Sequence, residues 1–153
     1  MKDREVINDP VLAYRRKKAE LAALGQGIKG SAKSEAILFV DLADSTTIKQ
    51  KLAPEEWLDF IFGFIETIGE HAKKNKGSVV KSIGDEVMLS FDLVSDAEKF
   101  IEELLKDQDL NGKYRYKVAA DYGEVYHFQF EQSLSLDPYG TAVDRCARIA
   151  KLA

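Results

Sequence analysis

The sequence predicts an α+β fold of the ferredoxin-like split βαβ type, with helices packed on one side of an antiparallel sheet. Apolar runs with strand character alternate with segments of helical periodicity, in the order β-α-α-β-β-α-β-β-α. The chain of 153 residues is 45% hydrophobic, so it can bury one core and is unlike a disordered chain. These two observations define the fold class, and the elements below justify it in turn.

The first 34 residues are predicted to be an N-terminal helix and a linker. Residues 9–24 have a modest apolar stripe, with Pro10 at the first helical position. Residues 25–34 are rich in Gly, Ser and Lys, which is typical of a linker. We therefore expect one main domain that covers residues 35–153.

The main domain is predicted to open with a buried strand followed by two helices. The strand predicted over Glu35 to Leu42 contains an uninterrupted apolar run, Ala36–Val40, which indicates burial on both faces of the strand. Ser45 to Leu52 is predicted as a short helix. Pro54 to Lys74 repeats its apolar residues at three- and four-residue spacing, with Pro54 at its start and Gly77 just beyond its end.

The second half is predicted to hold a hairpin, a helix, two more strands and a last helix. The hairpin turns at Gly84-Asp85, Ser95 is expected to cap the helix, and a turn at Gly123 is expected to separate the two strands. The last helix runs to the chain end. The predicted ranges are Val79–Ile83 and Glu86–Phe91 for the hairpin, Ser95–Leu105 for the helix, and Tyr114–Asp121 and Glu124–Glu131 for the strands.

The composition indicates which classes of binding partner and which cellular compartment to expect. The net charge of −4 gives no global attraction to nucleic acid or to an anionic membrane. No apolar run reaches the roughly 18 residues needed to span a bilayer, and the charged N-terminus has no apolar signal core. The single cysteine, Cys146, cannot form an internal disulfide, which fits a reducing compartment. We expect a cytoplasmic protein with no nucleic-acid or membrane partner.

Two acidic motifs stand at the ends of apolar runs, ILFVDLADST and VVKSIGDEVMLSF. The first strand ends at Asp41, and the hairpin turn presents Asp85. Carboxylates at strand ends are rigidly held yet reach solvent, and two that converge are suited to a hard divalent cation. Simpler interpretations are that Asp41 caps the next helix with Ser45 and that Asp85 only forms the turn.

Three motifs in this order resemble the catalytic domain of class III nucleotide cyclases, the adenylyl and guanylyl cyclase family. They are FVDLADST (Phe39 to Thr46), KSIGDEVM (Lys81 to Met88) and DPYGTAVDRCAR (Asp137 to Arg148). The resemblance implies attack of the ribose 3′-hydroxyl on the α-phosphate, with pyrophosphate as the leaving group. It also implies two divalent metal ions, Mg²⁺ or Mn²⁺, one at the hydroxyl and one at the triphosphate.

By this resemblance, Asp41 and Asp85 are the metal carboxylates, and the backbone carbonyl of Leu42 is a further metal ligand. Backbone amides at the following helix start are expected to face the phosphates. These amides belong to Ala43, Asp44, Ser45 and Thr46. Asp44 is a departure from the family, because a glycine or another small residue is common at its position.

The remaining site residues follow from the other two motifs. Lys81 and Asp137 match the residues that read adenine, and Arg148 matches the arginine that stabilises the transition-state phosphate. Asp144 stands where the family has an asparagine oriented toward the ribose, so the amide donor is lost and a negative charge is gained. Arg145 is a candidate to compensate that charge. The simpler interpretation of Lys81, Asp137 and Arg148 is an exposed charge or a turn residue.

The resemblance implies a homodimer with shared active sites and a role in second-messenger signalling. One subunit would supply Asp41 and Asp85, and the other would supply Lys81, Asp137, Asp144 and Arg148. Two substrates stay open: ATP, or a pyrimidine (UTP or CTP) as in bacterial anti-phage Pycsar systems. The family's C-terminal strands, with a phosphate-contacting lysine, have no counterpart here. A non-catalytic cyclase-like domain that binds nucleotide or a partner is the alternative.

Overall fold

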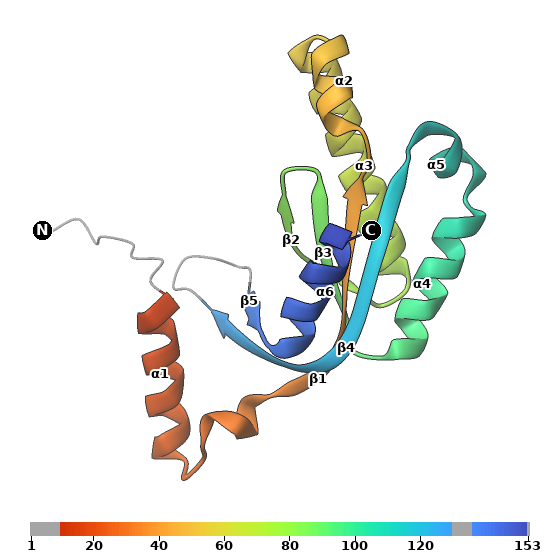
Figure 1. Cartoon of the computed structure of the whole chain (residues 1–153). Coiled ribbons are helices and arrows are strands. Elements are labelled where there is room, and N and C mark those ends of the chain that lie inside the picture. Colours follow the sequence, from red (N-terminus) through yellow and green to blue (C-terminus); the bar gives the residue numbers. More distant parts are fainter. Residues whose placement is uncertain (1–9, 130–135, 153) are drawn as a thin grey trace, which may run out of the picture.

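The computed structural model describes residues 10–129 and 136–152, with side chains for 11–126 and 140–150. Figure 1 shows a central sheet with helices packed against it. In chain order the elements are α1 (Pro10–Ala23), the 3₁₀ turn η1 (Ile28–Ser31), β1 (Lys33–Leu42), α2 (Ser45–Lys51), α3 (Pro54–Lys74), β2 (Ser78–Ile83), β3 (Glu86–Phe91), α4 (Val94–Lys106), α5 (Gln108–Lys113), β4 (Tyr116–Gln129), β5 (Leu136–Tyr139) and α6 (Thr141–Leu152).

The sheet confirms the predicted ferredoxin-like topology. Its strand order is β2-β3-β1-β4-β5, and β1 pairs antiparallel with both β3 and β4. α3 connects β1 to the hairpin, and α4 follows β3, so the first four strands and these two helices form the split βαβ unit. β5 extends the sheet by pairing with the far part of β4.

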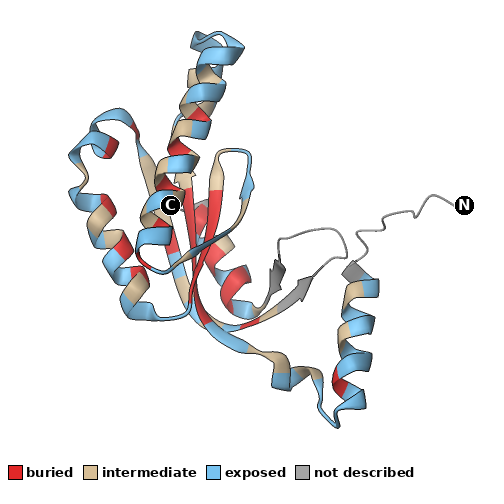
Figure 2. Cartoon of the chain, turned by 180° about the vertical axis from the view of Figure 1, so that it is seen from behind, coloured by how far each residue is buried: buried red, intermediate tan, exposed pale blue. Residues whose placement is uncertain are grey.

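β1 is buried on both faces, as its continuous apolar sequence predicts. Leu38 and Val40 belong to the core on the side of α3 and α4, which cover one face as expected. Ile37 and Phe39 point the other way, because successive strand residues alternate. They pack with Cys146 of α6, which covers part of the opposite face. Figure 2 shows the buried positions concentrated along the central strands.

α3 has the predicted bounds, Pro54–Lys74, and buries one side of the helix in the core. After it, Lys76 takes the left-handed conformation (φ 64°), while a Cβ on Gly77 would overlap the Phe91 ring. Gly77 is therefore required for close packing, and Lys76 makes the helix-ending turn. Although α3 has 21 residues, neither it nor another helix in the described ranges has the apolar length of a membrane span.

The predicted turn at Gly123 is wrong. β4 runs without interruption from Tyr116 to Gln129, and Gly123 pairs with Glu35 of β1 inside the sheet. A Cβ on Gly123 would lie 3.0 Å from the Cβ of Ala142 in α6. The glycine therefore permits the close approach of α6 to the strand. Close approach of another element is a common reason for a glycine inside a strand.

Two further predictions about helices need correction. α4 begins at Val94 with Leu93 as the N-cap residue, so Ser95 lies inside the first turn and does not cap it. The short helix α5 was not predicted. Its N-cap is Asp107, whose carboxylate accepts a hydrogen bond from the Leu110 amide at 3.0 Å.

The N-terminal helix lies beside the sheet with little of its own surface covered. α1 ends at Ala23, close to the predicted end, and Leu21 is its buried residue. Figure 2 shows most of this helix exposed. The predicted linker is shorter than expected, because β1 already begins at Lys33. The predicted cap, Asp9, lies outside the described residues, and the division at residue 34 stays a prediction.

Candidate active site

Asp41 and Asp85 lie together at one end of the sheet. Asp41 is the second-last residue of β1, paired with Glu86 of β3 on one side and with Lys117 of β4 on the other. Asp85 occupies the β2–β3 turn. The Leu42 amide donates to the Asp85 carbonyl at 3.3 Å, which holds the turn against the end of β1. Two elements that are far apart in the sequence thus bring the two carboxyl groups close.

The electrostatics of Asp41 fit a cation site. Burial raises the pKa of the Asp41 carboxyl, and the negative charge of Asp85 raises it further, while Lys117 lowers it. The Lys117 ammonium lies 4.0 Å from the Asp41 carboxylate. Two carboxylates that repel each other in a half-buried place favour a hard divalent cation between them.

The described residues contain no group of three His, Cys, Asp or Glu side chains around one point. The site therefore offers two carboxylates, and other ligands would be backbone carbonyls such as that of Leu42, water, or substrate oxygens. Mg²⁺ accepts such a set, because it keeps several waters and is commonly bound through one or two carboxylates plus phosphates. The residues present fit Mg²⁺ or Mn²⁺.

The helix start after β1 offers fewer amides than predicted. The Ala43 amide donates to the Arg115 carbonyl at 2.8 Å, so it is already engaged within the fold. Asp44 is the N-cap residue of α2 and adopts a left-handed conformation (φ 61°), without a side-chain cap. The amides of Asp44, Ser45 and Thr46 remain from the predicted set.

The structure does not support the simpler interpretation of Asp41 as a helix cap, but it agrees with that of Asp85 as a turn residue. In the part of the chain with described side chains, no hydrogen bond joins Asp41 to Ser45, so Asp41 is not a capping residue there. Asp85 does stand in the hairpin turn, beside Gly84 with its positive φ of 61°. Its position in the turn and its closeness to Asp41 are compatible.

Lys81 lies on the same face of the sheet as Asp41. It is in the edge strand β2, next to a register irregularity, and pairs with Met88 of β3. Met88 in turn pairs with Phe39 of β1, two residues before Asp41. Directly paired residues share a face, so Lys81 is placed on the side of the sheet that α6 covers.

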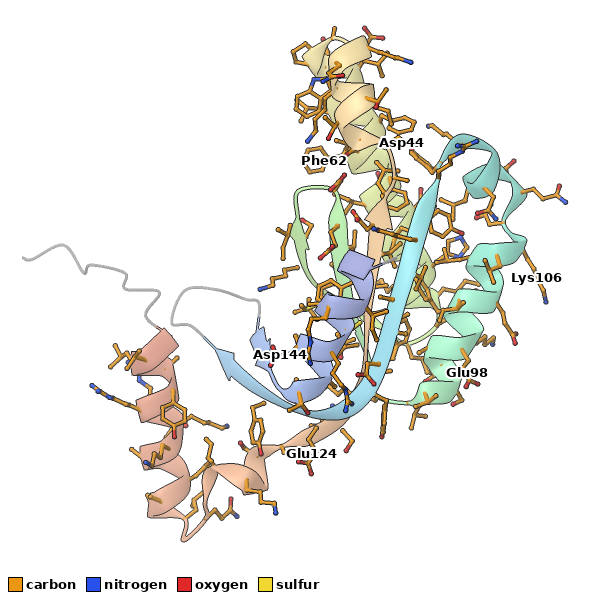
Figure 3. All side chains as sticks on the ribbon, viewed as in Figure 1. Asp44, Phe62, Glu98, Lys106, Glu124 and Asp144 are labelled. Carbon is orange, nitrogen blue, oxygen red and sulfur yellow. The ribbon has the colours of Figure 1, made fainter. Side chains whose placement is uncertain are left out.

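The third motif is carried by β5 and α6. Asp144 and Arg148 are both exposed on α6, four residues apart and thus on one helix face. Asp137 pairs through its backbone with Phe128 of β4, and its side chain lies outside the described ones. Figure 3 shows Asp144 well apart from Asp44, the neighbour of the metal motif.

The sequence did not single out Lys117 near the site, and it expected another partner for Arg145. Lys117 is a charged residue on the β4 face that also carries the buried Ala119 and Val125, and this position in line with core residues is a signal that could have drawn attention to it. Arg145 was a candidate to compensate Asp144. The structure instead pairs it with Asp121 of β4, with Nε 2.6 Å from Oδ2.

The fold agrees with a match to a family model, which identifies the chain as a class III nucleotide cyclase catalytic domain. The chain belongs to this family: residues 29–110, more than half of its length, match the adenylate and guanylate cyclase catalytic domain. It is thus a nucleotide cyclase domain, a lyase. No curated protein matches the sequence.

Solved cyclase structures share the fold. A bacterial light-regulated adenylyl cyclase is 24% identical, with 79% of this chain and 70% of that chain covered and a TM-score of 0.61. The adenylyl cyclase CyaB from P. aeruginosa is 18% identical (79% and 72% covered, TM-score 0.57). The guanylate cyclase domain of RhGC from Catenaria anguillulae, in complex with GTP, is 16% identical (78% and 72%, TM-score 0.63). Both adenylyl and guanylyl cyclases are thus among the similar structures.

Proposed function

We propose that the protein converts a nucleoside triphosphate to a 3′,5′-cyclic nucleotide and pyrophosphate at active sites shared by two copies of the chain. The observation that carries the proposal is the separation of the site residues. Asp41 and Asp85 lie together at one end of the sheet, whereas Asp144 lies on α6, well apart from Asp44, which follows Asp41 by three residues. A second copy that presents its α6 to the Asp41–Asp85 end would complete the site.

In the proposed reaction, the ribose 3′-oxygen forms a bond to the α-phosphorus, and the bond from that phosphorus to the pyrophosphate oxygen breaks. The hydroxyl proton is lost to solvent. Two divalent ions, Mg²⁺ or Mn²⁺, would lower the cost of the developing negative charge. Asp41, Asp85 and the Leu42 carbonyl would hold them. From the second copy, Arg148 would neutralise the α-phosphate and Asp144 would face the ribose.

The proposed base is adenine or a pyrimidine. Lys81 and Asp137, as in the family's adenine-reading pair, favour ATP. Asp144 in place of the usual asparagine favours UTP or CTP, as in anti-phage Pycsar signalling. The product would act as a second messenger, and the single cysteine fits a reducing cytoplasm.

The test is a product analysis with purified protein, Mn²⁺ and each of the four ribonucleoside triphosphates in turn. We expect one cyclic nucleotide, identified by mass spectrometry, from ATP, UTP or CTP. Asp41→Ala should abolish the product while the circular dichroism spectrum stays native. If no triphosphate gives a cyclic product, the catalytic proposal is wrong and the non-catalytic binding domain replaces it.

Complementation tests the shared site directly. Asp41→Ala and Arg148→Ala should each be inactive alone, because each damages both sites of its homodimer. When they are mixed and allowed to exchange subunits, each heterodimer has one intact site. We expect activity to return to about a quarter of the wild-type value, since half of the dimers are mixed and each of those has one working site. No recovery despite proven exchange would place all site residues within one chain.

A further inference from the structure

A two-point ion pair attaches one flank of α6 to the sheet. Arg145 of α6 donates through Nε to Asp121 Oδ2 at 2.6 Å and through Nη2 to Oδ1 at 3.3 Å, and Nη2 lies 3.5 Å from the Tyr122 carbonyl oxygen. Asp121 is a firm anchor, because β4 pairs it with Ile37 in the interior of the sheet. A planar guanidinium that binds a carboxylate at two points fixes direction as well as distance.

The buried side of α6 consists mainly of small apolar side chains. Its buried residues are Ala142, Val143, Cys146 and Ala150. Hydrophobic burial has no preferred direction, so these contacts hold α6 against the sheet but only weakly resist a rotation of the helix about its own axis. The ion pair of Arg145 adds a directional contact at the edge of this apolar side.

The same rotation decides where the catalytic pair of the proposed site, Asp144 and Arg148, points. At about 100° per residue, the two lie about 40° apart on the exposed side of α6, roughly opposite the buried Cys146. Arg145 lies about 100° from Asp144 around the helix, at the flank between the two sides. Side-chain ends lie roughly 5–6 Å from the helix axis, so a rotation of about 10° moves them by about 1 Å.

We propose that Asp121 is a positioning residue for the cyclase reaction: through Arg145 it sets the rotation of α6, and so the direction in which the catalytic pair reaches the site of a second copy. This inference rests on the proposed function. A misplacement of about 1 Å can cost about a hundredfold in rate. The loss should appear in kcat and not in KM, because Arg148 acts on charge that develops in the transition state.

Asp121→Asn is the test variant, and Asp92→Asn is its matched control. The first removes the charge and one acceptor oxygen while the side chain keeps its size. Asp92 forms a 2.8 Å ion pair with Lys33, so its substitution removes an ion pair that does not involve α6. We expect Asp121→Asn to lower kcat about tenfold with KM within about twofold, a part of the loss that a 1 Å misplacement can cause. Asp92→Asn should change neither, and urea denaturation should show that both variants are folded.

Subunit mixing tests whether Asp121 acts through the α6 of its own chain. In the mixed dimer of Asp41→Ala and Arg148→Ala, the working site uses α6 of the Asp41→Ala subunit. Asp121→Asn in that subunit should lower the recovered activity about tenfold. In the Arg148→Ala subunit it should leave that activity unchanged, because the α6 there serves the site that is already inactive. Both mixtures contain the same substitutions, so a general loss of stability would affect them alike.

The two mixtures separate positioning from structural support. Equal activities would overturn the inference, whether both fall or both stay at the level of the parent mixture. A raised KM with an unchanged kcat in Asp121→Asn would overturn it too. The parent mixture of Asp41→Ala and Arg148→Ala tests the proposed function separately: if it stays inactive although the subunits exchange, the shared site is wrong and the inference fails with it.

Discussion

Arg145 of α6 forms a two-point contact with Asp121 of β4. Its Nε donates to Oδ2 at 2.6 Å and its Nη2 donates to Oδ1 at 3.3 Å. These bonds hold the pKa of the Asp121 carboxyl below its usual value. The guanidinium next to Asp144 in the sequence is thus committed to another carboxylate, and it does not compensate the charge that distinguishes Asp144 from the family's asparagine.

Asp144→Asn should therefore increase activity. The substitution restores an amide donor toward the ribose and removes a negative charge from a site that handles a triphosphate. One recovered hydrogen bond in the transition state is worth about 1–1.5 kcal/mol, so we expect kcat to rise roughly tenfold. Steady-state kinetics with Mn²⁺ and the substrate found in the product analysis provide the measurement.

Glu98→Gln is the charge-matched control for Asp144→Asn. Glu98 lies on α4, away from α6 (Figure 3), and its substitution should leave kcat unchanged. A lower kcat in Asp144→Asn would show that the carboxylate itself is required, and this would contradict our account of Asp144 as a hindrance to catalysis.

Asp44 is the second departure from the family, and its backbone explains what the position requires. Its φ of 61° is left-handed, a conformation that glycine adopts without strain. We expect Asp44→Gly to exceed Asp44→Ala in free energy of unfolding by about 1 kcal/mol, because both remove the same charge and only alanine is strained there. Urea denaturation of the two variants measures the difference.

A second pair of substitutions controls for the general effect of glycine. At Glu66, exposed inside α3, glycine should be less stable than alanine by about 1 kcal/mol, because helical φ favours alanine. The order at Glu66 is thus opposite to that at Asp44. If alanine were also the more stable residue at position 44, the left-handed conformation would not describe the protein in solution.

The sequence predicted best the elements whose residue pattern is compatible with only one kind of structure. α3 repeats apolar residues at helical spacing after Pro54, and the observed bounds match. Gly123 was misread because a glycine is required both for a turn and for the close approach of another element. Only the packing of Ala142 against the strand separates these meanings. α5 was missed because six residues carry too little periodicity.

The candidate site also has residues that the sequence pattern identifies and residues that only the folded structure identifies. Each carboxylate was found from its place at a strand end, and the structure brings Asp41 and Asp85 together; their metal-binding role stays a prediction. Lys117 could not be connected to Asp41 from the sequence, because their contact depends on the register between β1 and β4. Such cross-strand neighbours are fixed by the folded sheet, where a shift of one residue would exchange the faces.

Asp107 links three helices, and its removal should cost stability in a pH-dependent way. Its carboxylate caps α5 and accepts a 2.8 Å hydrogen bond from the His71 ring in α3. We expect Asp107→Ala to lose about 1–2 kcal/mol at neutral pH, and Asp107→Asn, which keeps a capping oxygen, to lose less. Urea denaturation across a pH series measures both losses.

The pH dependence follows from the direction of the pKa shift. The bond from the Leu110 amide and then the bond with His71 lower the pKa of Asp107 in the folded protein. The stabilisation by this carboxylate is therefore complete above the ordinary Asp pKa of about 4 and disappears as the pH falls through the lowered value. The gap between wild type and Asp107→Ala should narrow in that acidic range, and a constant gap would contradict the role of the charge.

Cys146 should be inert in the folded protein. Its thiol is fully buried, and Sγ lies 3.3 Å from the carbonyl oxygens of both Ile37 and Ala119, either of which can accept the thiol hydrogen. Burial raises the pKa of the thiol to about 11. At about pH 8 only roughly one thiol in a thousand would be ionised, even if a reagent could reach it.

A disulfide reagent such as DTNB should therefore label the native protein only when the contact between α6 and the sheet opens. The denatured chain should react at once with one equivalent of reagent, since the sequence contains one cysteine. Rapid labelling without denaturant would mean that α6 leaves the sheet readily, and Cys146→Ala, which should not react at all, verifies that the signal comes from this thiol.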